Sequence, residues 1–182
     1  MSEDPRLRKL LWNTAGSAVF RMIPHNVYGL RRAVLRAFGA DIHARALVRR
    51  TARIERPWLL TMGDSAIIGD SAWLTGRGRI TLGDRCTVSQ LVQLATTQLL
   101  RDPSSARVCE DTADIVIGDD AWVAADTLVL PGSRVEREAL VGARSLVNGV
   151  MEAGMISAGQ PAVARRERGL RKASSAAAGA AA

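Results

Sequence analysis

Side chains that could accept a proton or bind a metal ion are few in this 182-residue chain. It contains two histidines, His25 and His43, and two cysteines, Cys86 and Cys109. Because these residues do not form the closely spaced Cys/His clusters of zinc sites, we expect no metal site and two reduced thiols. Other candidate proton acceptors are the carboxylates in or beside the polar segment 98–112: Asp102, Glu110, Asp111 and Asp114. A carboxylate can act as a general base when it lies within hydrogen-bonding reach of the reacting proton.

The residues that must position such chemistry follow a period of six. An aliphatic residue recurs at every sixth position: Ile117, Val123, Val129, Val135, Val141 and Val147. Two positions before each of the last five stands a small or modest residue: Ala121, Thr127, Ser133, Ala139 and Ser145. Because residues two apart on a strand face the same way, each pair indicates a short strand with both side chains inward. Three such strands and three corners close one triangular coil, so the period predicts a parallel β-helix of hexapeptide repeats.

The same rhythm begins at Ile42 and predicts about five coils. The first coils repeat after twenty residues, because one strand of each is longer, and from Ile117 the repeat tightens to eighteen. Gly118 and Gly142 stand where a corner favours left-handed backbone. The rhythm stops at Gln98 to Thr112, which we predict to be a loop that projects from a corner of the prism. Chemistry is expected in this loop.

Residues 1–39 are predicted to form a helical cap. Apolar residues recur at helical spacing within 5–22 and 27–38, with a break at 23–26. We favour a cap over the open end of the β-helix, because an uncovered coil exposes unpaired backbone groups. The alternative is that residues 5–38 form a basic amphipathic hairpin that contacts membrane lipid.

The formal net charge of +7 comes from the two ends of the chain, and the repeat body, residues 40–163, is close to neutral. The segment 164–182 is basic and then rich in alanine, so we predict that it is disordered. Because a nucleic-acid surface needs clustered positive charge with stacking aromatics, and only 4% of residues are aromatic, we expect no nucleic-acid partner. The start of the chain has no signal-peptide pattern, so we expect a cytoplasmic protein, at the inner face of the membrane if the cap binds lipid.

Several ordered strings resemble the hexapeptide acyltransferases, and particularly the colanic-acid-biosynthesis acetyltransferase branch, which is related to the serine, maltose and nodulation acetyltransferases. The strings include His25-Asn26, Ile68-Gly69-Asp70, Ser89-Gln90, Ala121-Trp122-Val123-Ala124-Ala125, Val141-Gly142-Ala143-Arg144-Ser145 and Gly159-Gln160-Pro161-Ala162. The resemblance spans residues 12–162. It implies an all-β, left-handed prism that assembles as a homotrimer, with acetyl-CoA bound in the grooves between neighbouring prisms.

Carried over by position, the resemblance implies that the pantetheine arm of acetyl-CoA runs along the backbone of five small residues: Ala124, Ala125, Gly142, Ala143 and Ser145. Arg165 and Arg166 would meet the nucleotide phosphates. Each assignment has a structural alternative. Corners and a narrow interior demand small residues in any case, and the two arginines could simply be solvated in the tail.

The chain departs from the family at its catalytic histidine, which takes a proton from the acceptor hydroxyl. The histidine position falls on Leu99, or on Gln98 if one residue is deleted, and neither side chain accepts a proton. His25 belongs to the break between the cap helices. His43 lies in the first coil, roughly 10 Å along the axis from the loop and too far for direct contact. The four carboxylates around the loop are the remaining candidates for the base.

Two functions of different class follow from these patterns. The first is an acetyl-CoA-dependent O-acetyltransferase that modifies a saccharide or lipid-linked saccharide during surface polysaccharide assembly. The second is a catalytically silent trimeric β-helix that binds coenzyme or a partner as a scaffold or regulator. The ordered strings favour the first function, and the missing histidine favours the second.

Overall fold

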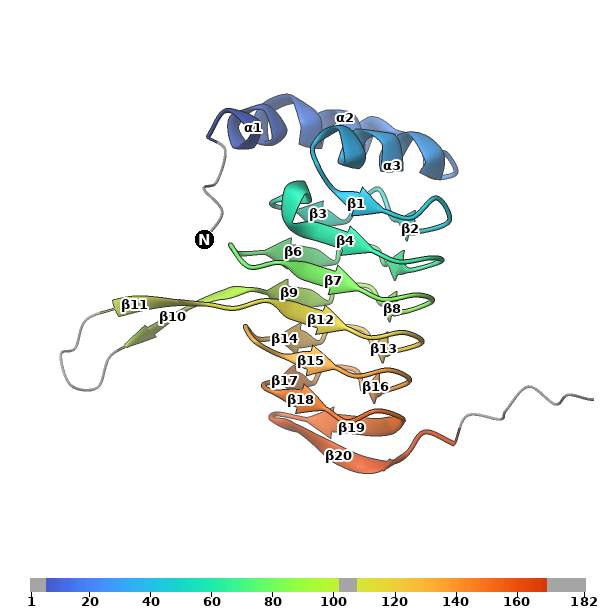
Figure 1. The fold of residues 1–182 in the computed structure, drawn as a ribbon, viewed down its shortest axis with the longest axis vertical. Helices are drawn as coiled ribbons and strands as arrows, with labels where there is room; N and C mark the ends of the chain where they lie inside the picture. The colour runs from blue at the N-terminus through green and yellow to red at the C-terminus, as the bar shows by residue number, and fades with distance from the viewer. Residues whose placement is uncertain (1–5, 102–107, 170–182) are drawn as a thin grey trace, which may run out of the picture.

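The computed structural model describes residues 6–101 and 108–169, which form a triangular parallel β-helix under a helical cap (Figure 1). Three sheets make its sides, and their strands are parallel except for the last, β20. Sheet A contains β1 (Asp41–Ile42), β4 (Leu60–Met62), β7 (Ile80–Leu82), β12 (Ile115–Ile117), β15 (Arg134–Val135) and β18 (Val150–Met151). Sheet B contains β2 (Leu47–Val48), β5 (Ile67–Ile68), β8 (Thr87–Val88), β13 (Trp122–Val123), β16 (Leu140–Val141), β19 (Met155–Gly159) and β20 (Ala162–Glu167). Sheet C contains β3 (Arg53–Ile54), β6 (Trp73–Thr75), β9 (Gln93–Ala95), β14 (Leu128–Val129) and β17 (Leu146–Val147).

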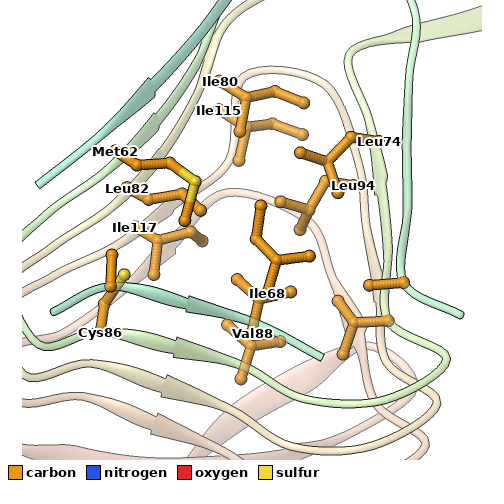
Figure 2. Packing of buried hydrophobic residues seen from close by; sticks show 14 of the residues in the cluster. Met62, Ile68, Leu74, Ile80, Leu82, Cys86, Val88, Leu94, Ile115 and Ile117 are labelled. Carbon is orange, nitrogen blue, oxygen red and sulfur yellow. The ribbon is translucent and has the colours of Figure 1, made fainter. Parts of the chain in front are cut away.

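The core consists of equivalent residues of successive coils stacked on one another. Met62, Leu82 and Ile117 are in register on sheet A, and Ile68 pairs with Val88 on sheet B. Figure 2 shows these side chains pointing into the prism. All five are buried, and the last residue of almost every short strand is buried in the same way. The six-residue period therefore forms the core that the sequence predicts, with an interior that suits aliphatic side chains.

The prism has more coils than the sequence predicts. Sheet A has six strands, whereas about five coils were expected. The last register step, from Arg134 to Val150, takes 16 residues rather than 18, which hides the final coil from a period-six pattern. β20 then turns back antiparallel to β19 and extends to Glu167, past residue 163, where the sequence predicts the body to end.

The corners use left-handed backbone at residues other than the expected glycines. The residues with positive φ at corners between sheets A and B are Ser65, Arg85, Asp120 and Glu138, and those between sheets B and C are Ser71, Leu91, Asp126 and Arg144. The expectation that Gly118 and Gly142 adopt this conformation is wrong. A Cβ on Gly118 would lie 2.7 Å from the backbone nitrogen of Arg137, and one on Gly142 would lie 3.0 Å from Cβ of Ala158. These glycines are explained by the close approach of the next coil.

The cap lies across the open end of the prism (Figure 1). It comprises α1 (Arg6–Leu11), the π-helical turn η1 (Trp12–Gly16), α2 (Ser17–Met22) and α3 (Tyr28–Ala37), and a short 3-10 turn, η2 (Pro57–Leu59), follows the first coil. Three α3 arginines donate to carbonyl oxygens of the first coil: Arg31 Nε to Val48 (2.9 Å), Arg32 Nη1 to Ala46 (3.0 Å) and Arg36 Nε to Ile42 (2.9 Å). The cap therefore satisfies backbone acceptors that an uncovered coil would leave unpaired, which confirms the predicted cap. None of the described helices is long and apolar enough to cross a membrane.

The interruption of the repeat is an arm rather than a loop. β10 (Thr97–Arg101) and β11 (Val108–Thr112) pair antiparallel, with Thr97 opposite Thr112 and Arg101 opposite Val108. Figure 1 shows this hairpin projecting from the prism between β9 and β12. The sequence prediction was right about the position and wrong about the conformation. Both faces of this two-stranded arm are largely exposed, so its sequence shows no alternation of apolar and polar residues. The hydrophobic pattern therefore could not reveal the two strands.

Candidate functional site

At one edge of the prism, between sheets B and C, each turn of the last three coils has two small residues followed by a polar one: Asp126, Arg144 or Gln160. We call residues 124–126, 142–144 and 158–160 the small-residue corner. The register pairs Val123 with Val141 and Val141 with Ser157, so the three turns stack. Backbone bonds join them, from Ala124 N to Val141 O (2.9 Å) and from Gly142 N to Ser157 O (2.8 Å). The structure thus brings together four of the five small residues predicted to line the coenzyme: Ala124, Ala125, Gly142 and Ala143.

Ser145 differs from the other four small residues because its side chain is inside the prism. It is 2% exposed, and its Oγ accepts a hydrogen bond from Gly159 N (3.2 Å). Thr127 is also buried and donates from Oγ1 to Gly142 O (3.1 Å). These two hydroxyls fix the backbone of the corner from within. The role of Ser145 here is to hold the turn at 159 in place.

The two arginines predicted to meet phosphates lie on β20, so they belong to the folded body and not to a solvated tail. Arg165 Nε donates to Ala158 O (3.3 Å), which places the guanidinium at the last turn of the small-residue corner. Arg166 is exposed and is paired with Ile156 on β19. Arg165 therefore lies at the corner through its hydrogen bond to Ala158, and Arg166 follows it on the same strand, opposite Ile156.

The hairpin carries the positions at which the family's histidine is expected. Leu99 is 68% exposed, and Gln98 Nε2 donates to Asp111 Oδ2 (2.9 Å) across the hairpin. The other described carboxylates are also engaged. Glu110 forms an ion pair with Arg77 (2.9 Å), and Asp114 Oδ1 accepts a hydrogen bond from Arg79 N (2.6 Å). The fourth candidate base, Asp102, lies outside the described residues.

Both histidines serve the capped end of the molecule. Arg49 Nη1 donates to His25 Nε2 (2.6 Å), and His43 Nδ1 lies 3.0 Å from Asp64 Oδ1. His43 follows β1, the first strand of sheet A, whereas the hairpin follows β9, the third strand of sheet C. His43 and the hairpin therefore belong to different coils. Within residues 6–101 and 108–169, no group of three or more His, Cys, Asp or Glu residues is arranged to hold a metal ion.

A tryptophan beside the corner was not given a role by the sequence. Trp122 is 43% exposed on the outer face of sheet B, and its indole Nε1 donates to Ser89 Oγ (2.8 Å). Trp122 stands two residues before Ala124. The string Ala121-Trp122-Val123-Ala124-Ala125 was the sequence signal that could have identified it. The hairpin, by contrast, leaves the edge between sheets C and A. The small-residue corner and the hairpin are thus on different edges of one chain.

The comparisons with known proteins place this architecture in a family. WcaF of Escherichia coli (strain K12), named for acetyl transfer in colanic acid biosynthesis, is 37% identical over 158 residues, which cover 87% of this chain and 86% of that protein. The chain belongs to the colanic acid biosynthesis acetyltransferase family. This confirms the resemblance that the motif strings indicate. No protein-family model matches the chain.

Solved structures agree with the hexapeptide-repeat acetyltransferase fold. A maltose O-acetyltransferase from Clostridium difficile 630 has a TM-score of 0.76 at 18% identity, over 90% of this chain and 89% of that chain. The hexapeptide-repeat acetyltransferase VCA0836 from Vibrio cholerae O1 biovar eltor, solved in complex with acetyl-CoA, has a TM-score of 0.74 at 20% identity, over 91% of this chain and 90% of that chain. The β-helix of this family member is therefore the fold of those enzymes.

Proposed function

We propose that this family member is an acetyl-CoA-dependent O-acetyltransferase that modifies a hydroxyl of a saccharide or lipid-linked saccharide in surface polysaccharide biosynthesis. The observation that carries the proposal is the 37% identity with WcaF over most of both chains. The acetyl-CoA complex of VCA0836, which has the same fold, supports acetyl-CoA as the donor.

The small-residue corner is the proposed coenzyme site. Ala143 is exposed and Ala124, Ala125 and Gly142 are half-buried, so a thin pantetheine chain can approach the backbone there. Arg165 at the last turn is suited to a phosphate of the nucleotide because a guanidinium binds phosphate with paired donors.

A homotrimer would unite the corner with the hairpin. In one chain the two lie on different edges, so the hairpin must reach the corner of a neighbour if both act on one substrate. The outer face of sheet B supports an assembly. Its outward side chain is apolar in five of the six coils, with Thr87 as the exception in the third; the apolar residues are Leu47, Ile67, Trp122, Leu140 and Ile156. Such a face is typical of an interaction surface.

In the proposed reaction, the acceptor hydroxyl oxygen attacks the thioester carbonyl carbon, the carbon–sulfur bond breaks, and the coenzyme leaves as a thiolate. The hydroxyl proton must go to a base. Leu99 cannot accept it, and Gln98 is held by Asp111. Because loss of a general base typically costs about 10²–10⁴ in rate, we expect transfer to be slow.

The test combines coenzyme binding with transfer. Calorimetry with acetyl-CoA, followed by mass spectrometry of products from a panel of free and lipid-linked sugars, would be run on wild type, Leu99→His and Leu100→His. The last is a matched control, because Leu100 is also exposed but faces the other side of β10. We expect binding by all three proteins and faster transfer only by Leu99→His. Absence of both coenzyme binding and acetylated product would remove the proposal.

A second candidate function is a catalytically silent β-helix that binds coenzyme or a partner as a scaffold or regulator. The engagement of Glu110, Asp111 and Asp114 by Arg77, Gln98 and Arg79 favours it, because these carboxylates serve structural contacts. It predicts coenzyme binding without wild-type turnover, and turnover in Leu99→His. Robust turnover by the wild type would exclude it.

A further inference from the structure

The outer side of the cap exposes an apolar surface that the fold does not need. The helical segment from α1 to α2 turns Trp12, Gly16 and Phe20 toward the prism, at a spacing of four residues. Several large apolar side chains of the cap are instead exposed: Leu7 70%, Leu10 60%, Leu11 49%, Met22 81% and Leu30 52%. We call these five residues the outer cap surface. Exposed apolar patches mark interaction sites on monomeric proteins, and these five side chains on the three cap helices could supply one.

The charges around the outer cap surface indicate what it contacts. Residues 6–40 include no Asp or Glu. The α3 arginines that contact the first coil face inward, and the Arg8 guanidinium lies against Gly39, whereas Arg6 and Arg21 are exposed. Two such surfaces from separate copies would repel each other. Anionic lipid headgroups complement them, and a basic helix with an exposed apolar side is typical of a segment that lies in a membrane interface.

The placement of the cap defines how the molecule would meet a bilayer. Figure 1 shows the cap helices lying across the end of the prism, away from the later coils. A flat contact through this end would stand the prism upright. The hairpin leaves after the third coil, so it would lie about 20–25 Å above the surface, given one helix diameter and two or three strand layers. That distance would suit the saccharide part of a lipid-linked acceptor.

We propose that the outer cap surface, with Arg6 and Arg21, docks the protein peripherally on an anionic phospholipid bilayer. The contact is interfacial, because none of the described helices is long and apolar enough to cross a membrane. The docking surface lies at the capped end, and the small-residue corner lies in the last three coils. Docking and acetyl transfer are therefore separable properties.

Flotation of the full chain with vesicles tests the proposal. Vesicles of phosphatidylcholine alone would be compared with vesicles that also contain phosphatidylglycerol. We expect binding only to the anionic vesicles, and weaker binding at high salt. The triple variant Leu7→Ser, Leu10→Ser, Met22→Ser should bind at least about tenfold more weakly. The double variant Arg6→Gln with Arg21→Gln should have an affinity for anionic vesicles that is about fivefold lower for each arginine removed.

The control variant is Leu91→Ser with Val150→Ser, which removes exposed apolar side chains outside the cap and should bind as wild type does. Circular dichroism of every variant checks the fold. Equal binding to both vesicle types, or no effect of the cap variants, would overturn the proposal. So would a cap variant that merely dissociates a larger oligomer. Transfer to a soluble acceptor should not change in the cap variants, so failure of docking is distinguishable from failure of the proposed function.

Discussion

The indole Nε1 of Trp12 donates a 2.7 Å hydrogen bond to the backbone carbonyl of Ile54, 42 positions along the chain. Trp12 also packs edge-on against Phe38, at 5.0 Å between ring centroids. The hydrogen bond to Ile54 joins the cap to sheet C, as the α3 arginines join it to sheets A and B. Trp12 therefore ties the cap to the first coil.

The first prediction concerns the Trp12 donor. Trp12→Phe keeps an aromatic ring but leaves the buried Ile54 carbonyl without this partner, so the free energy of unfolding should fall by about 1–3 kcal/mol. Urea unfolding measures the change. Trp73→Phe, at a half-exposed tryptophan of β6, is the matched control and should change stability by less than about 0.5 kcal/mol. Equal stability of wild type and Trp12→Phe would contradict the role of the bond.

The second prediction concerns Arg31, which is 0% exposed. Its guanidinium donates to Val48 O (2.9 Å), Pro24 O (2.7 Å) and His25 O (2.7 Å). Arg31→Met should cost at least about 3 kcal/mol, because several buried acceptors lose charged donors. Arg31→Lys should keep only part of this stability, because an ammonium group cannot reproduce the several fixed donors of a planar guanidinium. Arg50→Met, at an exposed corner, should be near neutral in the same urea experiment, and an equal cost there would count against the assignment.

The third prediction concerns acid stability. Burial acts to raise the pKa of Glu55, but hydrogen bonds from Thr75 Oγ1 and Gly76 N and the charge of Arg56 outweigh it, so the pKa lies below its ordinary 4.5. When folding lowers the pKa of a carboxyl group, its ionised form stabilises the protein at pH values above the pKa of the unfolded state. This stabilisation is lost as pH falls through the pKa of the folded state. Thermal midpoints of wild type should therefore drop below about pH 4.5, and the drop should be smaller in Glu55→Gln. Glu152→Gln, at an exposed turn, should follow wild type.

The fourth prediction concerns the thiols. Burial, with Asp119 and Asp84 nearby, raises the pKa of Cys86 to about 12, so its thiol is un-ionised and enclosed. Cys109 is exposed on β11. Native protein should incorporate one equivalent of a thiol reagent at Cys109, and Cys86 should react only after unfolding. Mass spectrometry locates the label, with Cys109→Ser as the control. Rapid native labelling of Cys86 would show that the prism opens readily.

The repeat body could be predicted from sequence because each coil places the same kind of residue in the same stacked position. Val88 and Val123, for example, are in register on sheet B, so a local period reports a long-range contact. The cap could be predicted only in outline. That Arg31 is a buried donor could not be foreseen, because basic residues on an amphipathic helix ordinarily face solvent. The acceptors it satisfies are backbone atoms, which leave no trace in the residue types.

The site was predicted unevenly for a related reason. Ala124 and Gly142 come together because corners repeat with the coils, so position alone brings them into register. Ser145 was grouped with them, but its inward orientation follows from the strand alternation at Val147. The hairpin has no buried face to impose a period. Its cross-strand partners, such as Gln98 and Asp111, were therefore beyond a pattern argument.

The fifth prediction tests the small-residue corner directly. Ala143 is exposed at the middle turn of the corner, so a large side chain can be placed there without disturbing the core. Ala143→Trp should weaken acetyl-CoA binding by at least about tenfold, because it occupies the surface along which the pantetheine arm is proposed to run. The thermal midpoint should stay unchanged.

Ala153→Trp is the matched control, because Ala153 is exposed at a turn on the edge between sheets A and B, away from the small-residue corner. Calorimetry on both variants separates a local block from a general effect of added bulk. Equal weakening by both substitutions would indicate a general effect, and unchanged binding in Ala143→Trp would place the coenzyme elsewhere on the prism. Loss of binding in Ala143→Trp alone would support the small-residue corner as the coenzyme site.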